Sequence, residues 1–305
     1  MRRFLRAGLT LLNLAGVIAL SGAAACAWSA AEAPLMEVKY WNSTQGRRDY
    51  EYQLLHLALE KTADNYPPYR LSRYTGNLGA LRGRRALAEG GPINVYAAPP
   101  REKRGDLEAR IASIPIPVMG GLLGYRQLIT RRHMLPVMAR ITTAAELKKY
   151  TVGQSQGWPD VTIFRQNNYP VNDMGRYINL FGMLEQGRFD YVSLGIVEAS
   201  RELAERQPES GSLILVPGLF IHYPLPIIFH VAKKYKGLPE RIEEGLLRAL
   251  KDGSMARLFR THFARELAAI QQDDVRVIKL DSSLPNLDWI SPSRYPPDMR
   301  WLHIP

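Results

Sequence analysis

Histidine and cysteine side chains in this sequence do not fall into the spacings that metal sites require. The six histidines are scattered along the chain: His56, His133, His222, His230, His262 and His303. No two of them stand four residues apart, the spacing that places two imidazoles on one face of a helix for zinc. Cys26 is the only cysteine, so the chain has no internal disulfide. The sequence therefore predicts no metal and no other cofactor.

The sequence offers no phosphate-binding loop, no spacing that singles out a catalytic trio and no nucleic-acid-binding pattern. Met119–Gly124 is rich in glycine but lacks the terminal Gly-Lys-Ser/Thr of a phosphate-binding loop. Serine, histidine and aspartate are numerous, but their spacing selects no catalytic trio. No run of lysine and arginine with interleaved aromatic residues suggests nucleic-acid binding. We expect a protein that is not an enzyme and has no nucleic-acid partner.

The elements that must position any site alternate between strand and helix. Met36–Trp41 has the pattern of a strand, and apolar residues at helical spacing predict a helix over Asp49–Ala63. The alternation restarts at Ala144 and predicts a second α/β unit. Further strands are predicted at Tyr69–Tyr74, Ile93–Ala97, Leu122–Thr130, Thr151–Gln154, Tyr191–Leu194, Pro224–Val231 and Val275–Leu280. Further helices are predicted at Ala144–Lys149, Asp160–Gln166, Gly175–Gln186, Val197–Gln207, Pro239–Lys251 and Ser254–Ile270. This alternation is typical of an α/β fold.

The N-terminus has the order of a secretory signal peptide over residues 1–31. Three arginines precede an apolar stretch, Ala7–Leu20, and small residues follow it. Cleavage before Trp28, cleavage before Glu32 and lipidation of Cys26 all remain open, as does an uncleaved anchor. The apolar stretch is shorter than the roughly 20 residues that cross a bilayer. The sequence thus predicts export to the periplasm.

Composition and charge fit a globular exported protein. The 305 residues are 46% hydrophobic and 23% charged, with a net charge of +11. Removal of the signal lowers this charge by three, because it holds three arginines and no acid. About 270 residues remain, enough for two medium lobes.

Six segments in series resemble the bacterial extracellular solute-binding proteins of family 3, the amino-acid-binding type. They cover nearly the whole mature chain in family order: Tyr52–Thr62, Ala98–Glu102, Ile114–Arg126, Val152–Gly157, Met183–Asp190 and Ile242–Ser254. Gly153–Asp160 and Ser283–Pro285 near Trp301 are similar to a divergent branch of that family.

The resemblance implies a two-lobed periplasmic-binding-protein type II fold, α/β throughout, with two crossovers near Leu128 and Ile227. Lobe one would comprise residues 34–127 plus 226–280, and lobe two residues 128–225. Residues 281–305, rich in proline and aromatic side chains, would form an extended tail. A ligand would bind between the lobes, and closure about the hinge would bury it.

The resemblance also implies where a ligand would bind. Arg101, with Arg104 as the alternate, matches the arginine that grips a ligand carboxylate. Gly157, Trp158 and Asp160 belong to the start of a helix, where free N–H groups favour an anion. Asp160 has a second role open to it, as the cap of that helix.

Gly195 departs from the family pattern and makes a standard α-amino acid a poor candidate. The family carries an aspartate there that pairs with the ligand ammonium group, and glycine has no side chain to do so. Aromatic faces and one hydroxyl would complete the expected ligand-binding set: Trp41, Trp158, Tyr191, Ser193 and Tyr223. Each aromatic residue has core packing as its alternative role.

Three functions remain open. The first is a periplasmic solute-binding protein that closes on a small polar or anionic ligand, for an ABC permease or a membrane sensor, as a monomer. The second is a dehydratase-like periplasmic enzyme on the same fold, with Asp160 or His222 as the base. The third is an accessory protein that has lost ligand binding, which a cleft filled by side chains would favour.

Overall fold

The computed structural model describes residues 34–42, 47–76, 78–101, 105–206 and 211–281. The predicted signal peptide, Cys26, Arg104 and the C-terminal tail beyond Asp281 therefore lie outside the described residues. Within the described ranges, no helix combines the length and the apolar character needed to cross a membrane.

A five-stranded sheet forms the core of the first lobe. Its order is β2-β1-β3-β10-β4. The first three strands run parallel, and β10 is antiparallel to both of its neighbours. The strands are β1 Met36–Trp41, β2 Tyr69–Arg73, β3 Val95–Ala98, β4 Ile111–Ser113 and β10 Ile228–Ala232.

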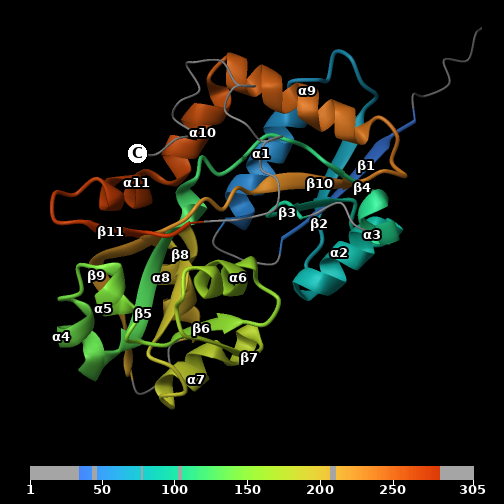
Figure 1. Cartoon of the computed structure of the whole chain (residues 1–305). Coiled ribbons are helices and arrows are strands. Elements are labelled where there is room, and N and C mark those ends of the chain that lie inside the picture. Colours follow the sequence, from blue (N-terminus) through green and yellow to red (C-terminus); the bar gives the residue numbers. More distant parts are fainter. Residues whose placement is uncertain (1–33, 43–46, 77, 102–104, 207–210, 282–305) are drawn as a thin grey trace, which may run out of the picture. The chain divides into compact units, whose positions relative to one another are not determined.

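Helices cover both faces of this sheet. Figure 1 shows α1 (Arg48–Glu60), α9 (Leu238–Lys251) and α10 (Ser254–His262) on one face, with α2 (Gly79–Glu89) and α3 (Gly105–Ala109) on the other. A Cβ at Gly245 would lie 2.0 Å from the Ala58 carbonyl oxygen. Only glycine therefore permits the close approach of α9 to α1.

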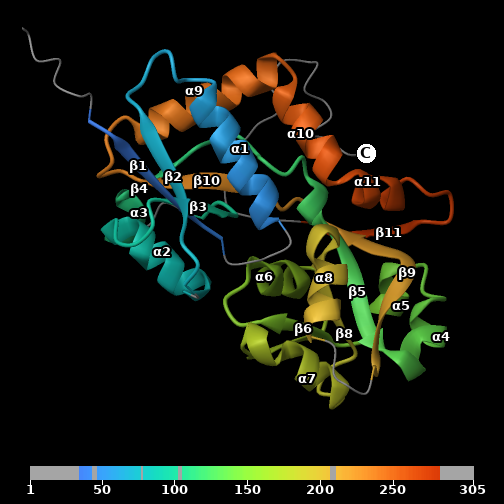
Figure 2. The same cartoon turned by 180° about the vertical axis from the view of Figure 1, so that it is seen from behind.

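A six-stranded sheet forms the second lobe, in the order β11-β9-β5-β8-β6-β7 (Figure 2). Side chains of α7 and α8 pack with Ile129, Val192 and Leu194 on one face. The strands are β5 Tyr125–Arg131, β6 Val152–Ser155, β7 Val171–Gly175, β8 Tyr191–Gly195, β9 Leu213–His222 and β11 Arg276–Lys279. The helices of this lobe are α4 Leu135–Met138, α5 Ala144–Leu147, α6 Pro159–Gln166, α7 Leu180–Glu185 and α8 Ile196–Arg206. A further helix, α11 Ala264–Ile270, lies in the sequence between α10 of the first lobe and β11 of the second.

Two neighbouring connections carry the chain between the sheets. Residues 114–124 lead to β5, and residues 223–227 lead back to β10. The amide N–H of Val118 donates to the Ile227 carbonyl at 2.8 Å, and that of Tyr223 donates to the Gly124 carbonyl at 3.3 Å. Leu128 lies inside β5, paired with Ser193, so the first crossing precedes it.

The prediction that Val275–Leu280 joins the first lobe is wrong. β11 runs parallel to β9 at the edge of the second sheet, and the Leu280 N–H donates to the His222 carbonyl at 2.8 Å. Arg276 fastens this strand by donating to the Ala139 and Ile141 carbonyls at 2.6 and 2.8 Å. The cause is β9, a strand that the sequence pattern did not predict and that offers β11 a free edge.

His230 sits fully buried in β10 as a neutral imidazole. Its Nδ1 lies 2.9 Å from the Ser113 hydroxyl, and its Nε2 lies 3.3 Å from the Ala98 and Pro99 carbonyl oxygens. Burial, with the positive charge of Arg84, lowers the pKa of His230 to about 3. The ring therefore holds the end of β3 in place without carrying charge.

We expect His230 to make the fold sensitive to acid. The unfolded chain binds a proton at His230 below about pH 6.5 and the folded chain only near pH 3, so the free energy of unfolding falls as pH drops between these values, by up to ~5 kcal/mol. His230→Gln should flatten this part of the pH profile in urea unfolding, while His133→Gln, at an exposed site, should not. Equal slopes in wild type and His230→Gln would contradict the assignment.

Candidate functional site

The start of α6 has its glycine turn and its proline where the sequence predicts them, but the alternative role of Asp160 as the helix cap is wrong: the cap is Trp158, without a side-chain hydrogen bond. Gly157 adopts φ +78°, which turns the chain from β6 into the helix, and Pro159 takes the first helical position. Asp160 follows in the first turn, where a negative charge favours the helix dipole. Its carboxylate is buried, at 4% exposure for the residue, so it must find partners within the protein.

Asp160 pairs with Arg126 and Tyr223. Arg126 Nη2 lies 2.8 Å from Asp160 Oδ1, and the Tyr223 hydroxyl donates to the same oxygen at 2.5 Å. Arg126 also donates to the Leu123 and Ser193 carbonyls at 3.2 and 3.3 Å. Three of the predicted site residues, Asp160, Ser193 and Tyr223, thus meet around an arginine that the sequence analysis did not single out.

The charge of Arg126 is secured by this pairing. Burial alone would lower its pKa, but the Asp160 carboxylate, with Tyr223 and Glu198, raises the pKa above its usual value. The guanidinium stays protonated, and the interaction is a buried ion pair rather than a shared proton.

Two buried polar atoms beside this pair lack hydrogen-bond partners among the described residues. They are Arg126 Nε, a donor, and Gln154 Oε1, an acceptor. Both side chains bond the same carbonyl of Ser193, Gln154 through its Nε2 at 3.2 Å. Because buried polar groups are nearly always paired, with protein or with water, this donor and this acceptor mark the region as a candidate for binding a small polar group.

A second charged cluster joins the two lobes. Arg47, just before α1, donates from Nη1 to Glu51 Oε1 at 2.6 Å and from Nε to Glu198 Oε1 at 3.1 Å. Glu198 lies in the first turn of α8, in the other lobe. The side chains of Arg47 and Glu198 are 5% and 9% exposed. This ion pair therefore bridges the two lobes.

Glu51 sits at the centre of this second cluster. The Tyr40 hydroxyl and the Asn42 amide also donate to its carboxylate. Burial raises the pKa of Glu51, and Arg47, Tyr40 and Asn42 only partly offset this. Burial alone would lower the pKa of Arg47, but Glu51 and Glu198 raise it beyond its usual range, so Arg47 remains a cation.

Gly195 lies where the two clusters meet. A Cβ there would stand 2.4 Å from Leu123 Cδ1, 3.2 Å from Glu198 Oε2 and 3.4 Å from Arg126 Nη1. A side chain at position 195 would therefore displace Leu123. Gly195 supplies no carboxylate, but the carboxylate of Glu198, in the first turn of the helix that follows, lies next to this position.

The remaining predicted site residues lie apart from these clusters. Arg101 is exposed after β3, and Tyr191 is fully buried in the core. Trp41 donates its indole N–H to the Gly76 carbonyl at 3.0 Å and packs on Tyr96 at 5.0 Å between ring centroids. Both Trp41 and Tyr191 therefore fit their alternative role as core residues, while Trp158 packs against Tyr177 at 5.2 Å between ring centroids.

The two candidate bases of an enzyme are not arranged as an acid–base pair. Asp160 is bound to Arg126 and Tyr223, whereas the His222 ring packs against Tyr125, with 4.5 Å between ring centroids and an angle of 49° between the ring planes. Burial and the charge of Lys279 lower the pKa of His222. In the described part of the chain, no three histidine, cysteine or acidic side chains gather as metal ligands.

Solved structures identify the fold. The VFT2 domain of Bordetella pertussis BvgS (double mutant F375E/Q461E) aligns with a TM-score of 0.52 and 15% identity over 75% of this chain and 93% of that chain. An ancestral arginine-binding protein bound to arginine aligns at 0.51 and 15% over 76% and 99%. An arginine third transport system periplasmic binding protein from Legionella pneumophila aligns at 0.51 and 14% over 75% and 100%.

These likenesses establish that the chain has the two-lobed periplasmic-binding-protein type II fold with two crossovers, as the sequence predicts. No protein-family model matches the chain, and no curated protein matches its sequence.

We expect Arg126 and Asp160 to stabilise the second lobe as a unit. Asp160→Asn should lower the free energy of unfolding by about 3 kcal/mol, because it leaves the Arg126 cation buried without a counter-charge. Arg126→Met should cost a similar amount, and the double variant less than the two single changes added together. Urea unfolding of the four proteins measures this coupling.

Asp173→Asn is the matched control for this cycle. Asp173 pairs with Arg165, whose side chain is 55% exposed, so its loss should cost under ~1 kcal/mol. Additive effects of the Arg126 and Asp160 changes would show that the two side chains do not act together.

Proposed function

We propose that this protein is an exported, periplasmic solute-binding protein, a divergent relative of the family 3 amino-acid binders, that closes on a small polar ligand without catalysis. One observation carries the proposal: Arg47 of the first lobe and Glu198 of the second lobe meet beside Arg126 and Gln154, which hold an unmatched donor and acceptor. The fold supports the proposal, since two lobes joined by two connections can open and close.

The ligand must satisfy a donor and an acceptor at once. Arg126 Nε calls for an acceptor atom, and Gln154 Oε1 calls for an N–H or O–H. Amides, carboxylic acids in their neutral form and hydroxylated compounds present such a pair. A carboxylate elsewhere on the ligand would bind Arg101, whose exposed side chain follows β3 of the first lobe.

The expected partners follow from this role. An ABC permease or a membrane sensor would recognise the closed, ligand-bound protein. The protein would act as a monomer. The structures that align include the periplasmic binding protein of an arginine third transport system and the VFT2 domain of BvgS. Recognition by a permease and recognition by a sensor are both compatible with the proposal.

Gln154 offers the cleanest test of the ligand site. Native mass spectrometry of the purified protein should identify a retained small polar compound, and calorimetry should then give its affinity. Gln154→Leu should weaken binding about 3- to 10-fold, the value of one neutral hydrogen bond. Gln186→Leu, an exposed change on the same lobe, should leave the affinity unchanged. Equal affinities for both variants and wild type would show that the ligand does not bind at Gln154.

A second candidate function is an accessory protein that stays closed without any ligand. The observation that favours it is the mutual neutralisation of charge within the two clusters: Arg126 is held by Asp160, and Arg47 by Glu51 and Glu198. The chain's own side chains then supply the contacts that would otherwise come from a ligand.

Glu198→Gln separates the two candidates. Breaking a buried ion pair costs several kcal/mol, so this variant should shift the lobes toward an open form with a larger radius in small-angle scattering. Glu205→Gln, which removes an exposed partner of Arg201, should have no such effect.

For a solute-binding protein, ligand should restore the compact form of Glu198→Gln. For an accessory protein, no compound should restore it, and wild type should scatter identically with and without small molecules. An unchanged radius in Glu198→Gln would show that the ion pair does not hold the lobes together.

A further inference from the structure

The first sheet ends at β2, and within the described ranges no strand pairs with the outer side of β2. The Pro68 carbonyl and the Tyr74 N–H, at either end of the strand, form hydrogen bonds of 2.8 and 2.9 Å with β1. Because the N–H and C=O groups of successive residues point to opposite sides of a strand, residues 69, 71 and 73 face away from β1. The Tyr52 hydroxyl, which donates to the Leu71 carbonyl at 3.2 Å, lies on that outer side.

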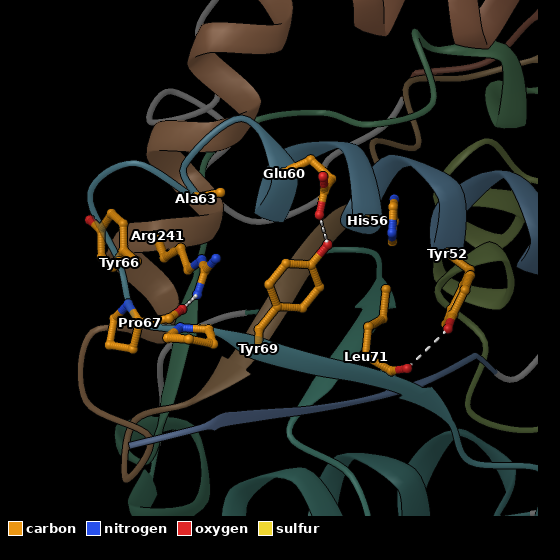
Figure 3. Close-up of a pocket in the computed structure, with 10 residues that line it drawn as sticks. Tyr52, His56, Glu60, Ala63, Tyr66, Pro67, Tyr69, Leu71 and Arg241 are labelled. Carbon is orange, nitrogen blue, oxygen red and sulfur yellow. Dashed lines mark hydrogen bonds between the residues drawn. The ribbon is translucent and has the colours of Figure 1, made fainter. Parts of the chain in front are cut away.

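A hollow of about 660 Å³ lies beside this edge. Figure 3 shows Tyr52, His56 and Glu60 of α1 on one side of it and Tyr69 and Leu71 of β2 on the other. We use "aromatic groove" for the surface formed by these five side chains. Since the lining comes from both the helix and the edge strand, side chains of a strand added to β2 would enter the groove.

The walls of the aromatic groove are fixed by contacts within the chain. The Tyr69 hydroxyl donates to Glu60, so this ring offers a partner its apolar face rather than its hydroxyl. Arg241, fully buried beneath the groove, donates to the Pro67 and Leu59 carbonyls at 2.7 and 3.2 Å and lies 4.9 Å from the Tyr69 ring centroid. The groove is therefore formed before any partner binds.

A second hollow continues the surface along α1. It has a volume of about 510 Å³, lies between α1 and α10, and shares Tyr52, His56 and Glu60 with the first. Leu57 and Leu258 add apolar lining to it. The two hollows together form an elongated surface, which suits an extended chain of several residues better than a compact small molecule.

The two faces of β2 call for different side chains in a partner strand. Tyr69 and Leu71 line the aromatic groove, so Arg70 between them points to the opposite face. The Arg70 side chain is 68% exposed, and its 3.2 Å ion pair with Glu37 is a surface pair of small energy. A strand added to β2 would therefore place apolar residues in the groove and acidic residues beside Arg70.

The charge around the aromatic groove also favours an acidic partner. Arg241 bonds to carbonyl oxygens and makes no ion pair with any described carboxylate. Arg257, exposed in the second hollow, donates to the Asp252 carbonyl and likewise has no carboxylate partner in the described part of the chain. We propose that β2 binds an extended acidic segment of a partner protein, which joins the first sheet as a strand and places alternate apolar residues in the aromatic groove.

This interaction would be separate from solute binding. All five residues of the aromatic groove belong to α1 and β2 of the first lobe, whereas Arg126 and Gln154 belong to strands of the second lobe. A partner segment would bind whether or not the protein holds a solute, so failure of either proposal leaves the other measurable.

Synthetic peptides test the proposal on the full mature protein. The probes are acetylated octapeptides that alternate glutamate with leucine, valine, phenylalanine or tyrosine, and the controls have the same composition with all glutamates at one end. The alternating peptides should bind more tightly than their controls in calorimetry. The amides of Leu71 and Arg73 should become protected from exchange in NMR spectra when an alternating peptide binds, because they gain hydrogen-bond partners.

Methylation of the peptide backbone shows whether a strand is formed. In an added strand, the amides of every second residue face β2 and the others face solvent. N-methylation of the set that faces β2 should therefore weaken binding about tenfold or more, through the loss of several backbone hydrogen bonds, and N-methylation of the other set should change it little. This readout leaves the protein itself unaltered.

Leu71→Pro tests the same contact from the side of the protein. Proline at an outward-facing position of an edge strand removes the N–H that a partner would use and leaves the bonds to β1 in place. It should weaken binding about tenfold or more, whereas Leu71→Ala, which keeps the N–H, should weaken it less.

Three results would overturn the proposal: no alternating peptide with a Kd below about 1 mM, equal binding of alternating peptides and their controls, or equal effects of the two methylation patterns. A dimer of the protein that Leu71→Pro dissociates would assign the edge of β2 to a second copy of the chain and would overturn it as well.

Discussion

A guanidinium that is buried between two sheets has to find its counter-charges within the chain, and this constraint organises the region where the lobes meet. Arg47 and Arg126 are both shielded from solvent, so each is surrounded by carboxylates and carbonyl oxygens. The cost of leaving either cation unpaired would exceed the gain from packing it. The start of α6 and the start of α8 are therefore drawn toward these arginines, and Gly195 leaves the space in which they meet.

The regular elements could be predicted wherever the apolar period is clean. Met36–Trp41 is found as a strand with the predicted bounds, and the helix predicted at Asp160–Gln166 begins one residue earlier, at Pro159. The pattern failed at β9, because Pro217 and Gly218 interrupt its middle, Gly218 adopts φ +64°, and its pairing with β5 shifts register. Because β9 was not predicted, the second sheet had no strand edge for β11 to pair with, and β11 was assigned to the wrong lobe.

The sequence could predict the residues of the site that lie in the second lobe, but not the ion pair that bridges the two lobes. Asp160, Ser193 and Tyr223 follow from the strand and helix ends that the resemblance points to, and the structure brings them together. Arg47 and Glu198 are 151 residues apart and belong to different sheets, so nothing local marks them as partners. Arg126 is the last residue of the family-like segment Ile114–Arg126, but its alternation with apolar neighbours gives no hint that its side chain is buried beside Asp160.

The charge balance of the two clusters restricts the ligand more than the position of any one side chain. Arg47 and Arg126 face Glu51, Glu198 and Asp160, and burial raises the pKa of Glu51. With Glu51 protonated the group is neutral, and with Glu51 ionised it is singly negative, so in neither state does it hold an excess of positive charge. A bare anion would enter without compensation, at a cost that grows as water is excluded. The site as built therefore suits a neutral or zwitterionic ligand, and an anion would need Arg101 to move in from the first lobe.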